Sequence, residues 1–458
     1  MIEIDRYRSI LGTYRLKDKV GISPESPSGG GIQTATDARR VSGATDAHGV
    51  IRSGDVWRKP YSEVSMARAG IRATLTHVDS NGDFTMSERY RRAMRRSQHR
   101  MDALGEMLTV SGIDDRATVH DGLGEYMMDL AVGTPALAFS AIMDTGSDLV
   151  WAQCRPCVEC LPHSPLRYVP SNSSTYSASP CTDSYCKALP STCTTACQYH
   201  YDYMDSSWTD GVLSTETFTF GSGDPIPNIT FGCGYNNSFN TPFYASGLVG
   251  LGPGSLSLVS QLGFGKFSYC LTSIDDLSST GALLLGSFAE LKEPASAIRS
   301  TPLVADSYYF LDLRGISVGA TLLPIPSDTF ANKIFIDSGT TFTVLPRAAL
   351  ELVKQELLSV VDLPPANDIP WFDLCFQLKS GEVPQLPDMT FHFSGADMVL
   401  PMPNYMVVDT EAGVMCLAMK PSSVPMSIFG NFQQQNMHIL YDVAGKTLSF
   451  APAECHKL

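Results

Sequence analysis

The sequence predicts a mainly β protein built from two related lobes. From residue 125 onward, short runs of β-branched and aromatic residues alternate with clusters of Gly, Pro, Ser and Asn, as in strands joined by turns. One motif occurs twice, 193 residues apart (337 − 144), as Asp144-Thr145-Gly146-Ser147 and Asp337-Ser338-Gly339-Thr340. Of the 458 residues, 43% are apolar, which suffices for a sizeable core in roughly two or three domains.

The expected strands and helices follow from this alternation of apolar runs and turn residues. Strands are expected at Tyr126–Val132, Gly211–Phe220, Ser268–Leu271, Ala282–Leu285, Tyr308–Val318 and Lys446–Phe450. Helices are expected at Ser257–Leu262 and Pro346–Val361, the second with Pro near its start and an apolar side. No run of 18 apolar residues occurs, so no membrane span is predicted.

The N-terminal part differs from the rest of the chain. Residues 1–65 are polar and contain PESPSGGG, which predicts an unstructured extension. No signal peptide is visible at Met1, because the first residues lack an apolar core. The extension is either a targeting or regulatory tail or, as we prefer, the product of a misassigned start that replaced a signal peptide. Residues 71–76 alternate like a strand, and a basic amphipathic helix follows, with Tyr90, Met94, Met101, Leu104 and Leu108 on one face.

Charge divides the chain in the same place. Residues 1–120 hold 19 Lys and Arg against 15 Asp and Glu, a net of +4, whereas residues 121–458 hold 14 against 32, a net of −18. The acidic body argues against nucleic acid and against anionic membranes as partners. The basic helix could bind a membrane, calmodulin or nucleic acid, or rest on the acidic body, and the sequence alone favours none of these strongly.

All twelve cysteines lie between Cys154 and Cys455. Such crowding indicates disulfides or zinc, and the scattered His residues favour disulfides of an oxidising compartment. Three N-glycosylation sequons, at Asn172, Asn228 and Asn236, support the same compartment.

The repeated motif carries the predicted chemistry. Each copy ends an apolar run and is followed, 106 and 93 residues later (250 − 144 and 430 − 337), by two apolar residues and Gly. One copy alone predicts a β-turn, but two copies with the same flanks favour a site in which Asp144 and Asp337 face each other. Two adjacent carboxylates share a proton, so one can activate a water while the other polarises a carbonyl. The supporting residues are Thr145, Gly146, Ser147, Ser338, Gly339 and Thr340.

From about residue 66 onward, these motifs resemble plant aspartic proteases of the nepenthesin-like branch of the pepsin family. The resemblance implies a bilobal pepsin-like fold with the active-site cleft between two lobes. It implies a prosegment at 66–121, an N-terminal lobe at 122–300 with a Cys-rich insertion at 154–197, and a C-terminal lobe at 301–458. It also implies the disulfide pairs Cys154–Cys157, Cys160–Cys233, Cys181–Cys197, Cys186–Cys193, Cys270–Cys455 and Cys375–Cys416.

The flap is where the sequence departs from that family. The family pattern Tyr-Gly-Asp-Gly-Ser corresponds here to Tyr203-Met204-Asp205-Ser206-Ser207, with Trp151 as the residue that supports the flap Tyr. Both tip glycines are replaced, which predicts a stiffer flap and a narrower substrate range, unless Met204 faces solvent with negative φ and nothing changes.

The expected function is that of an aspartic endopeptidase, a hydrolase acting on proteins or peptides at acidic pH. The basic prosegment is expected to act as an intramolecular inhibitor that acid releases. No cofactor and no metal site are expected, and the protein is expected to be a monomer in the apoplast or the vacuole. The alternative is a catalytically weak or inactive relative that acts as a binding or inhibitor protein, since the resembled family includes xylanase inhibitors.

Overall fold

The computed structural model describes residues 70–458 except for positions 81, 96, 98–125, 162–163, 165, 167, 190, 204–206, 240–244, 332, 368, 380–381 and 423–425. The predicted extension at 1–65 therefore lies outside the described residues, as do Met101, Leu104 and Leu108 of the basic helix and the flap tip at 204–206.

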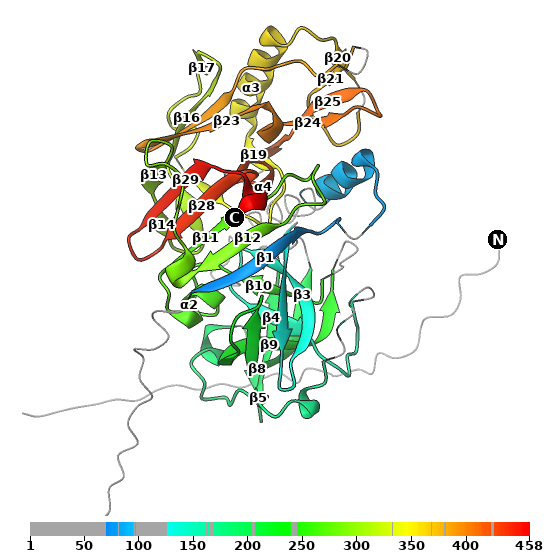
Figure 1. The fold of residues 1–458 in the computed structure, drawn as a ribbon, viewed down its shortest axis with the longest axis vertical. Coiled ribbons are helices and arrows are strands. Elements are labelled where there is room, and N and C mark those ends of the chain that lie inside the picture. The colour runs from blue at the N-terminus through cyan, green and yellow to red at the C-terminus, as the bar shows by residue number, and fades with distance from the viewer. Residues whose placement is uncertain are drawn as a thin grey trace, which may run out of the picture. The chain divides into compact units, whose positions relative to one another are not determined.

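A 15-stranded sheet runs through the described part of the chain, in the order β13-β29-β28-β11-β12-β1-β2-β3-β10-β4-β9-β8-β7-β6, with β5 beside β8 (Figure 1). The strands are β1 (Ile71–His77), β2 (Tyr126–Val132), β3 (Leu137–Asp144), β4 (Val150–Gln153), β5 (Ser177–Ala178), β6 (Ser191–Cys193), β7 (Cys197–Asp202), β8 (Trp208–Phe220), β9 (Ile226–Ser238), β10 (Gly247–Gly250), β11 (Lys266–Cys270), β12 (Gly281–Leu285), β13 (Arg299–Pro302), β28 (Met437–Asp442) and β29 (Thr447–Pro452). Strands from both halves of the chain thus share one sheet.

Three smaller sheets are built from residues 304–429. A six-stranded sheet contains β14 (Val304–Ala305), β15 (Tyr309–Leu311), β18 (Ile334–Ile336), β27 (Ser427–Phe429), β19 (Thr343–Pro346) and β26 (Met419–Ser422). Two four-stranded sheets contain β16 (Leu313–Val318), β17 (Thr321–Leu322), β22 (Met389–Phe393) and β23 (Ala396–Leu400), and β20 (Pro365–Ala366), β21 (Cys375–Gln377), β24 (Met406–Asp409) and β25 (Val414–Leu417). The prediction of a mainly β protein is confirmed.

The helices form where the sequence favours them. In α2 (Leu258–Leu262), the Ser257 hydroxyl caps the first turn, and Gly263 ends the helix with φ 64°. In α3 (Arg347–Val360), Leu350, Val353 and Leu357 form the buried side. A short α4 (Asn431–Gln434) follows β27. Residues 86–95 and 97 are helical, in agreement with the predicted basic helix.

Most predicted strands are present with small shifts of their ends. The run at 308–318 is an exception, because it breaks at Asp312 into β15 and β16, which belong to different sheets. Alternation alone does not reveal such a break, since both parts keep buried apolar residues.

Strand β1 lies in the middle of the large sheet. It pairs antiparallel with β12 on one side, from Ile71 opposite Leu285, and with β2 on the other, from His77 opposite Tyr126 (Figure 1). Its alternate residues Ile71, Ala73 and Leu75 are buried in the main core. Strand β1, which lies in the expected prosegment at 66–121 and is called the leader strand below, is therefore an integral part of this sheet.

Candidate active site

Both aspartates of the repeated motif lie at strand ends and are fully buried. Asp144 is the last residue of β3, and Asp337 directly follows β18. Each Asp strand lies beside a parallel strand made of the later apolar-apolar-Gly residues: β10 beside β3, and β27 beside β18. The two copies of the motif therefore have the same local architecture.

The two carboxylates have matching hydrogen bonds. The Gly146 N–H donates to Asp144 Oδ1 (3.1 Å), and the Ser147 hydroxyl donates to Asp144 Oδ2 (2.5 Å). In the second copy, the Gly339 N–H donates to Asp337 Oδ1 (2.8 Å) and the Thr340 hydroxyl to Asp337 Oδ2 (2.5 Å). Both oxygens of each carboxylate are thus held by the turn that follows.

The residues between Asp and Gly join the two loops. The Thr145 N–H donates to the Ser338 hydroxyl (3.0 Å), and the Ser338 N–H donates to the Thr145 hydroxyl (2.9 Å). The Ser338 hydroxyl also donates to the Met143 carbonyl (3.2 Å). These reciprocal bonds bring the two motifs together across a sequence separation of 193 residues.

Steric crowding explains the glycines that follow the apolar residues of β10 and β27, which we call the bracing strands because they lie beside the two Asp strands. A side chain at Gly250 would place its Cβ 2.3 Å from the Asp148 carbonyl carbon, and one at Gly430 would place it 2.5 Å from the Thr341 carbonyl oxygen. The apolar-apolar-Gly pattern therefore marks where each bracing strand passes tightly against the segment after its Asp loop.

The sequence analysis did not identify the polar residues Asn431 and Gln434, which support the Asp337 loop. The Gln434 side-chain amide donates to the carbonyls of Asp337 (3.1 Å) and Phe429 (2.8 Å), and Asn431 donates to the Ser338 carbonyl (2.9 Å). Both side chains are fully buried. The available signal was the run Asn431-Phe432-Gln433-Gln434-Gln435, which directly follows Gly430 between two apolar strands.

Asp148, four residues after Asp144, also escaped the sequence analysis. Burial raises the pKa of Asp148 to about 6, although the Gly254 N–H donates to Asp148 Oδ1 (2.8 Å) and opposes this effect. A Cβ at Gly252 or Gly254 would lie 2.4 or 2.1 Å from this carboxylate. The glycines of the 250–254 loop therefore form a close-fitting pocket for the Asp148 side chain.

The predicted flap residues contact each other. The Trp151 indole N–H donates to the Tyr203 hydroxyl (2.7 Å), and both side chains are buried. Phe239 stacks on Trp151 with ring centroids 5.5 Å apart. The Tyr201 hydroxyl accepts from the Asp148 (3.1 Å) and Leu149 (3.3 Å) N–H groups, which links the flap strand β7 to the segment after Asp144.

The helix at residues 86–95 and 97, called the leader helix below, contacts the segment after Asp337. The Phe342 N–H donates to the Ser97 hydroxyl (3.3 Å), and Tyr90 and Met94 pack in one cluster with Phe342 and Phe432. The Tyr90 hydroxyl donates to Asp275 Oδ1 (2.5 Å). Burial raises the pKa of Asp275, against the lowering effect of the Tyr90 hydrogen bond.

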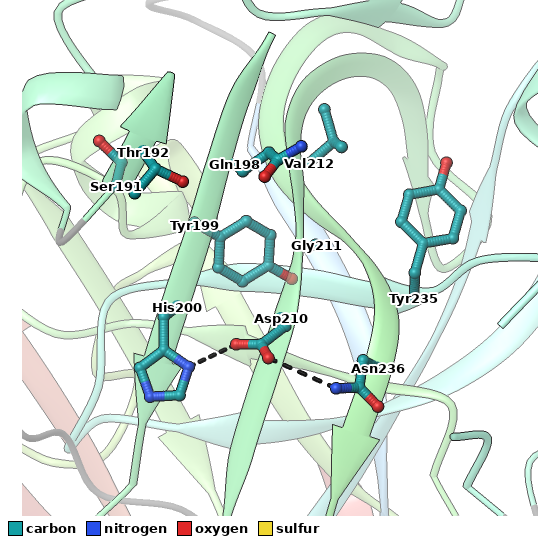
Figure 2. A pocket seen from close by; sticks show the side chains of 10 residues that line it. All are labelled: Ser191, Thr192, Gln198, Tyr199, His200, Asp210, Gly211, Val212, Tyr235 and Asn236. Atoms are coloured by element: carbon teal, nitrogen blue, oxygen red, sulfur yellow. Dashed lines mark hydrogen bonds and ion pairs between the residues drawn. The ribbon is translucent and has the colours of Figure 1, made fainter. Parts of the chain in front are cut away.

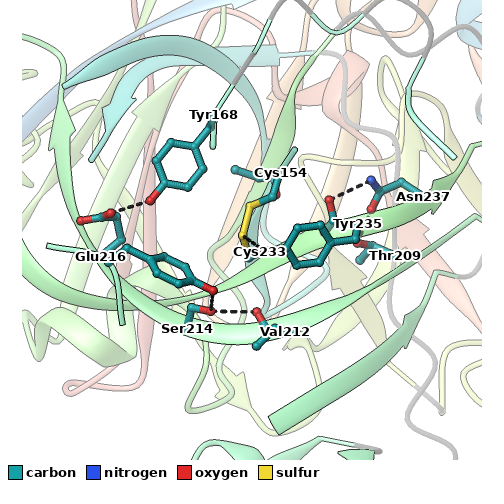
Figure 3. Close-up of a disulfide and its surroundings, with 12 residues drawn as sticks. Cys154, Tyr168, Thr209, Val212, Ser214, Glu216, Cys233, Tyr235 and Asn237 are labelled. Carbon is teal, nitrogen blue, oxygen red and sulfur yellow. Dashed lines mark hydrogen bonds between the residues drawn. A yellow bond between two sulfur atoms is a disulfide. The ribbon is translucent and has the colours of Figure 1, made fainter. Parts of the chain in front are cut away.

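All twelve cysteines are in disulfides, and two of the expected pairs, Cys270–Cys455 and Cys375–Cys416, are present. The expected pairs Cys154–Cys157 and Cys160–Cys233 are wrong, because Cys154 pairs with Cys233 (Figure 3) and Cys157 with Cys160. The reason is strand pairing: β4 lies parallel to β9 with Ala152 opposite Cys233, and the Cys154 N–H donates to the Gly234 carbonyl (2.9 Å).

The expected pairs Cys181–Cys197 and Cys186–Cys193 are also wrong. The structure pairs Cys181 with Cys193 and Cys186 with Cys197. Burial separates these pairs, because Cys186 and Cys197 are both buried in one apolar cluster, whereas Cys181 is exposed and Cys193 is half-buried. Sequence spacing contains no information about this difference.

The three sequons have different surroundings. Asn172 and Asn228 are exposed, and Asn228 has φ 64°. Asn236 is half-buried on β9, and its side-chain amide points to Asp210 Oδ2 (3.5 Å). Within the described ranges, no group of three His, Cys, Asp or Glu side chains is arranged to hold a metal ion, and no helix is long and apolar enough to cross a membrane.

Comparisons with known proteins agree with this geometry. Two family models match the chain, "Xylanase inhibitor N-terminal" over residues 126–287 and "Xylanase inhibitor C-terminal" over residues 308–452. Among solved structures, basic 7S globulin from soybean aligns with a TM-score of 0.61 at 16% identity, over 84% of this chain and 97% of that one. That likeness shows the fold alone.

Similarity to curated proteins is much higher. The chain is 46% identical over 402 residues to aspartic proteinase nepenthesin-1 of Nepenthes gracilis, covering 84% of this chain and 90% of that protein. It is 43% identical over 402 residues to aspartic proteinase nepenthesin-2 of the same species, with the same coverage. These relatives do not favour the inhibitor alternative. The chain belongs to the plant nepenthesin-like branch of pepsin-family aspartic proteases, and it is an aspartic endopeptidase.

Proposed function

We propose that Asp144 and Asp337 are the catalytic pair with which this endopeptidase hydrolyses peptide bonds in proteins at acidic pH. The observation that carries the proposal is the reciprocal pair of hydrogen bonds between Thr145 and Ser338, which joins two Asp loops of the same design. Adjacent carboxylates repel each other when both are ionised, so the pair retains one proton. The ionised carboxylate takes a proton from water, and the protonated one polarises the substrate carbonyl.

The remaining loop residues act on this pair indirectly. The Gly146 and Gly339 N–H groups and the Ser147 and Thr340 hydroxyls donate to the carboxylates and fix their orientation. The chemistry therefore needs two positioned carboxylates, one shared proton and a water.

Single substitutions of the two aspartates test this assignment. Asp144→Ala and Asp337→Ala should each lower cleavage of a denatured protein at pH 3.5 by at least about 1000-fold, because either change removes one partner of the pair. Asp224→Ala, which changes an exposed carboxylate elsewhere, is the control and should retain activity. Substantial cleavage by either active-site variant, with its fold intact, would contradict the assignment.

Residues 66–121 are proposed to be a prosegment that holds the enzyme inactive before acid activation. The support is the position of the leader helix, where Ser97 contacts Phe342, five positions after Asp337. The Tyr90–Asp275 hydrogen bond gives this contact a pH dependence, because the Tyr90 hydroxyl stabilises the ionised carboxylate and the bond weakens when Asp275 is protonated. In the same scheme, residues 122–300 form the N-terminal lobe and 301–458 the C-terminal lobe.

Tyr90→Phe tests the role of this helix. The change removes the donor to Asp275 and weakens docking, so loss of the leader should begin at a higher pH than in the unmodified chain. The measurement is the pH at which half of the protein has been processed after a fixed time. Tyr185→Phe, in the Cys-rich region, serves as a matched control. Equal midpoints for Tyr90→Phe and the unmodified chain would show that the Tyr90–Asp275 contact does not help to hold the helix in place.

The cellular setting follows from the chemistry. Six disulfides fit an oxidising compartment. We place the protein in the apoplast or the vacuole, as a monomeric glycoprotein whose substrates are proteins or peptides. The exposed Asn172 and Asn228 are the preferred glycan acceptors, because a sugar attached there meets no packed side chains.

A further inference from the structure

A cavity of about 650 Å³ lies on the outer face of strands β6 to β9 (Figure 2). Along β7, Tyr199 and Tyr201 are buried toward Trp151, whereas the alternating residues Gln198 and His200 are exposed. Gln198 and His200 line the cavity, and Tyr199, which lies between them on β7, also borders it. The cavity therefore opens on the face of the flap strands opposite to Tyr203 and Trp151.

The side chains that line the cavity are mainly neutral and polar. Ser191 and Thr192 contribute hydroxyls, Gln198 and Asn236 contribute amides, and Tyr235 contributes an aromatic ring. Each amide presents a donor and an acceptor side by side. Such groups match ligands that carry neighbouring hydroxyls, which are themselves both donors and acceptors.

A β-bulge creates this lining. Asp210 pairs with Asn236, but the next residue, Gly211, pairs with Gly234, so Tyr235 is the extra residue on β9. Neighbouring strand residues ordinarily point to opposite faces, yet Tyr235 and Asn236 both line the cavity. A Cβ at Gly211 would lie 2.1 Å from the Cys233 carbonyl oxygen, so the bulge requires glycine there.

The Asn236 side chain has one hydrogen-bond acceptor, Oδ1, that no described residue uses. Its amide nitrogen lies 3.5 Å from Asp210 Oδ2, and its Oδ1 is buried without a hydrogen-bond partner in the described part of the chain. A buried acceptor of this kind is stabilised when a ligand or water donates to it. The orientation of Asn236 thus leaves one acceptor for a ligand donor.

The charges around the cavity disfavour anions. His200 bonds to Asp210 through Nδ1 and to Asp202 through Nε2 (3.0 Å). One imidazolium between two carboxylates leaves the group with a net negative charge, so phosphate or carboxylate ligands would be repelled. The apolar part of the lining comes mainly from Val212 and the rings of Tyr199 and Tyr235, and aromatic rings suit packing against a sugar ring.

We propose that this cavity binds a neutral saccharide. The amides and hydroxyls bond to its hydroxyl groups, and the Tyr235 ring packs against a sugar face. Asn236 also begins the sequon Asn236-Asn237-Ser238, so the sugar has two possible sources: a free oligosaccharide, or a glycan carried by Asn236 itself. The proposal is independent of the catalytic pair, because the cavity contains neither aspartate of the repeated motif.

The first test uses the full chain with Asp144→Ala, refolded from bacteria so that it carries no glycan. Xylotriose and chitotriose, both neutral, and trigalacturonate, an anion, are titrated by calorimetry at pH 5.5. At least one neutral trisaccharide should bind, and trigalacturonate should not. Gln198→Leu and Asn236→Leu should each weaken binding at least about fivefold, the effect of one lost hydrogen bond. Ser238→Ala destroys the sequon outside the cavity and should bind like the parent.

The proposal is overturned if neither neutral sugar binds, if trigalacturonate binds equally well, or if the folded Gln198→Leu protein binds unchanged. A second test distinguishes the two sources, with the same chain secreted from yeast and Asn236 analysed by peptide mass spectrometry. An unmodified Asn236 with retained trisaccharide binding identifies the free sugar. A glycan at Asn236 that blocks the trisaccharide, with binding restored by Ser238→Ala, identifies the attached sugar. A glycosylated Asn236 with undiminished trisaccharide binding also overturns the proposal.

Discussion

The loops at Asp144 and Asp337 share their hydrogen bonds but differ in what lies behind them. The Asp337 loop rests on the buried amides of Asn431 and Gln434. The Asp144 loop continues into Asp148, whose carboxylate fits against the glycines of residues 250–254. A four-residue motif therefore determines its own turn, whereas long-range packing determines how each copy is supported. The two aspartates sit in unequal surroundings even though their nearest donors match.

The largest expected stability effect concerns the link between the loops. Thr145→Val leaves the buried Ser338 N–H without its acceptor, and Ser338→Ala does the same to the Thr145 N–H. Each should lower the free energy of unfolding by about 2–4 kcal/mol. Each hydroxyl also has a second partner, the Met143 carbonyl for Ser338 and the Tyr441 hydroxyl for Thr145, so the two losses should be similar. Urea unfolding at pH 5 measures both, and a loss below about 1 kcal/mol in either variant would contradict the importance of the link.

The second prediction concerns the support found only behind Asp144. Burial raises the pKa of Asp148 to about 6 in the folded state, whereas in the unfolded chain it lies near the ordinary value of 3.8. Ionisation of Asp148 therefore carries a stability penalty, and the free energy of unfolding falls as pH rises from about 4 through 6. Asp148→Asn should remove up to about 3 kcal/mol of this penalty at pH 7 and change little at pH 3.5. Unfolding curves at the two pH values test this. Parallel pH dependence in both proteins would rule out Asp148 as the source.

The smallest expected effect concerns the flap, a feature of the N-terminal half. Restoring glycine at the tip with Met204→Gly and Ser206→Gly should relax the hairpin and widen the set of peptides cleaved, with a few-fold change in kcat/KM for each. A peptide-mixture digest analysed by mass spectrometry measures the range. An unchanged cleavage pattern would mean that Met204 adopts its conformation without constraint.

The sequence predicted those parts of the site that are local or repeated. The Asp turns and the strands beside them follow from short motifs in which chemistry dictates residue type, whereas the contact of Trp151 with Tyr203 was expected from the family resemblance. Asn431, Gln434 and Asp148 were missed because they are polar groups in a buried setting, and hydropathy places such residues at the surface. Their burial becomes evident only when their partners, carbonyls and glycine N–H groups from distant segments, are known.

The disulfides illustrate the same limit. Cys270–Cys455 and Cys375–Cys416 were expected correctly, whereas the crowded cysteines between 154 and 233 were not. In that region each cysteine has several sequence neighbours, so strand register and burial decide the pairing. Spacing along the chain measures neither quantity.

The central position of β1 has a consequence for what happens after activation. Its neighbours β12 and β2 would both become open strand edges if the leader were cut away and lost. Such edges pair readily with strands of other chains, which is a common route to aggregation. If the proposed prosegment is removed, the remaining chain would therefore need another strand between β12 and β2 to avoid pairing with other chains.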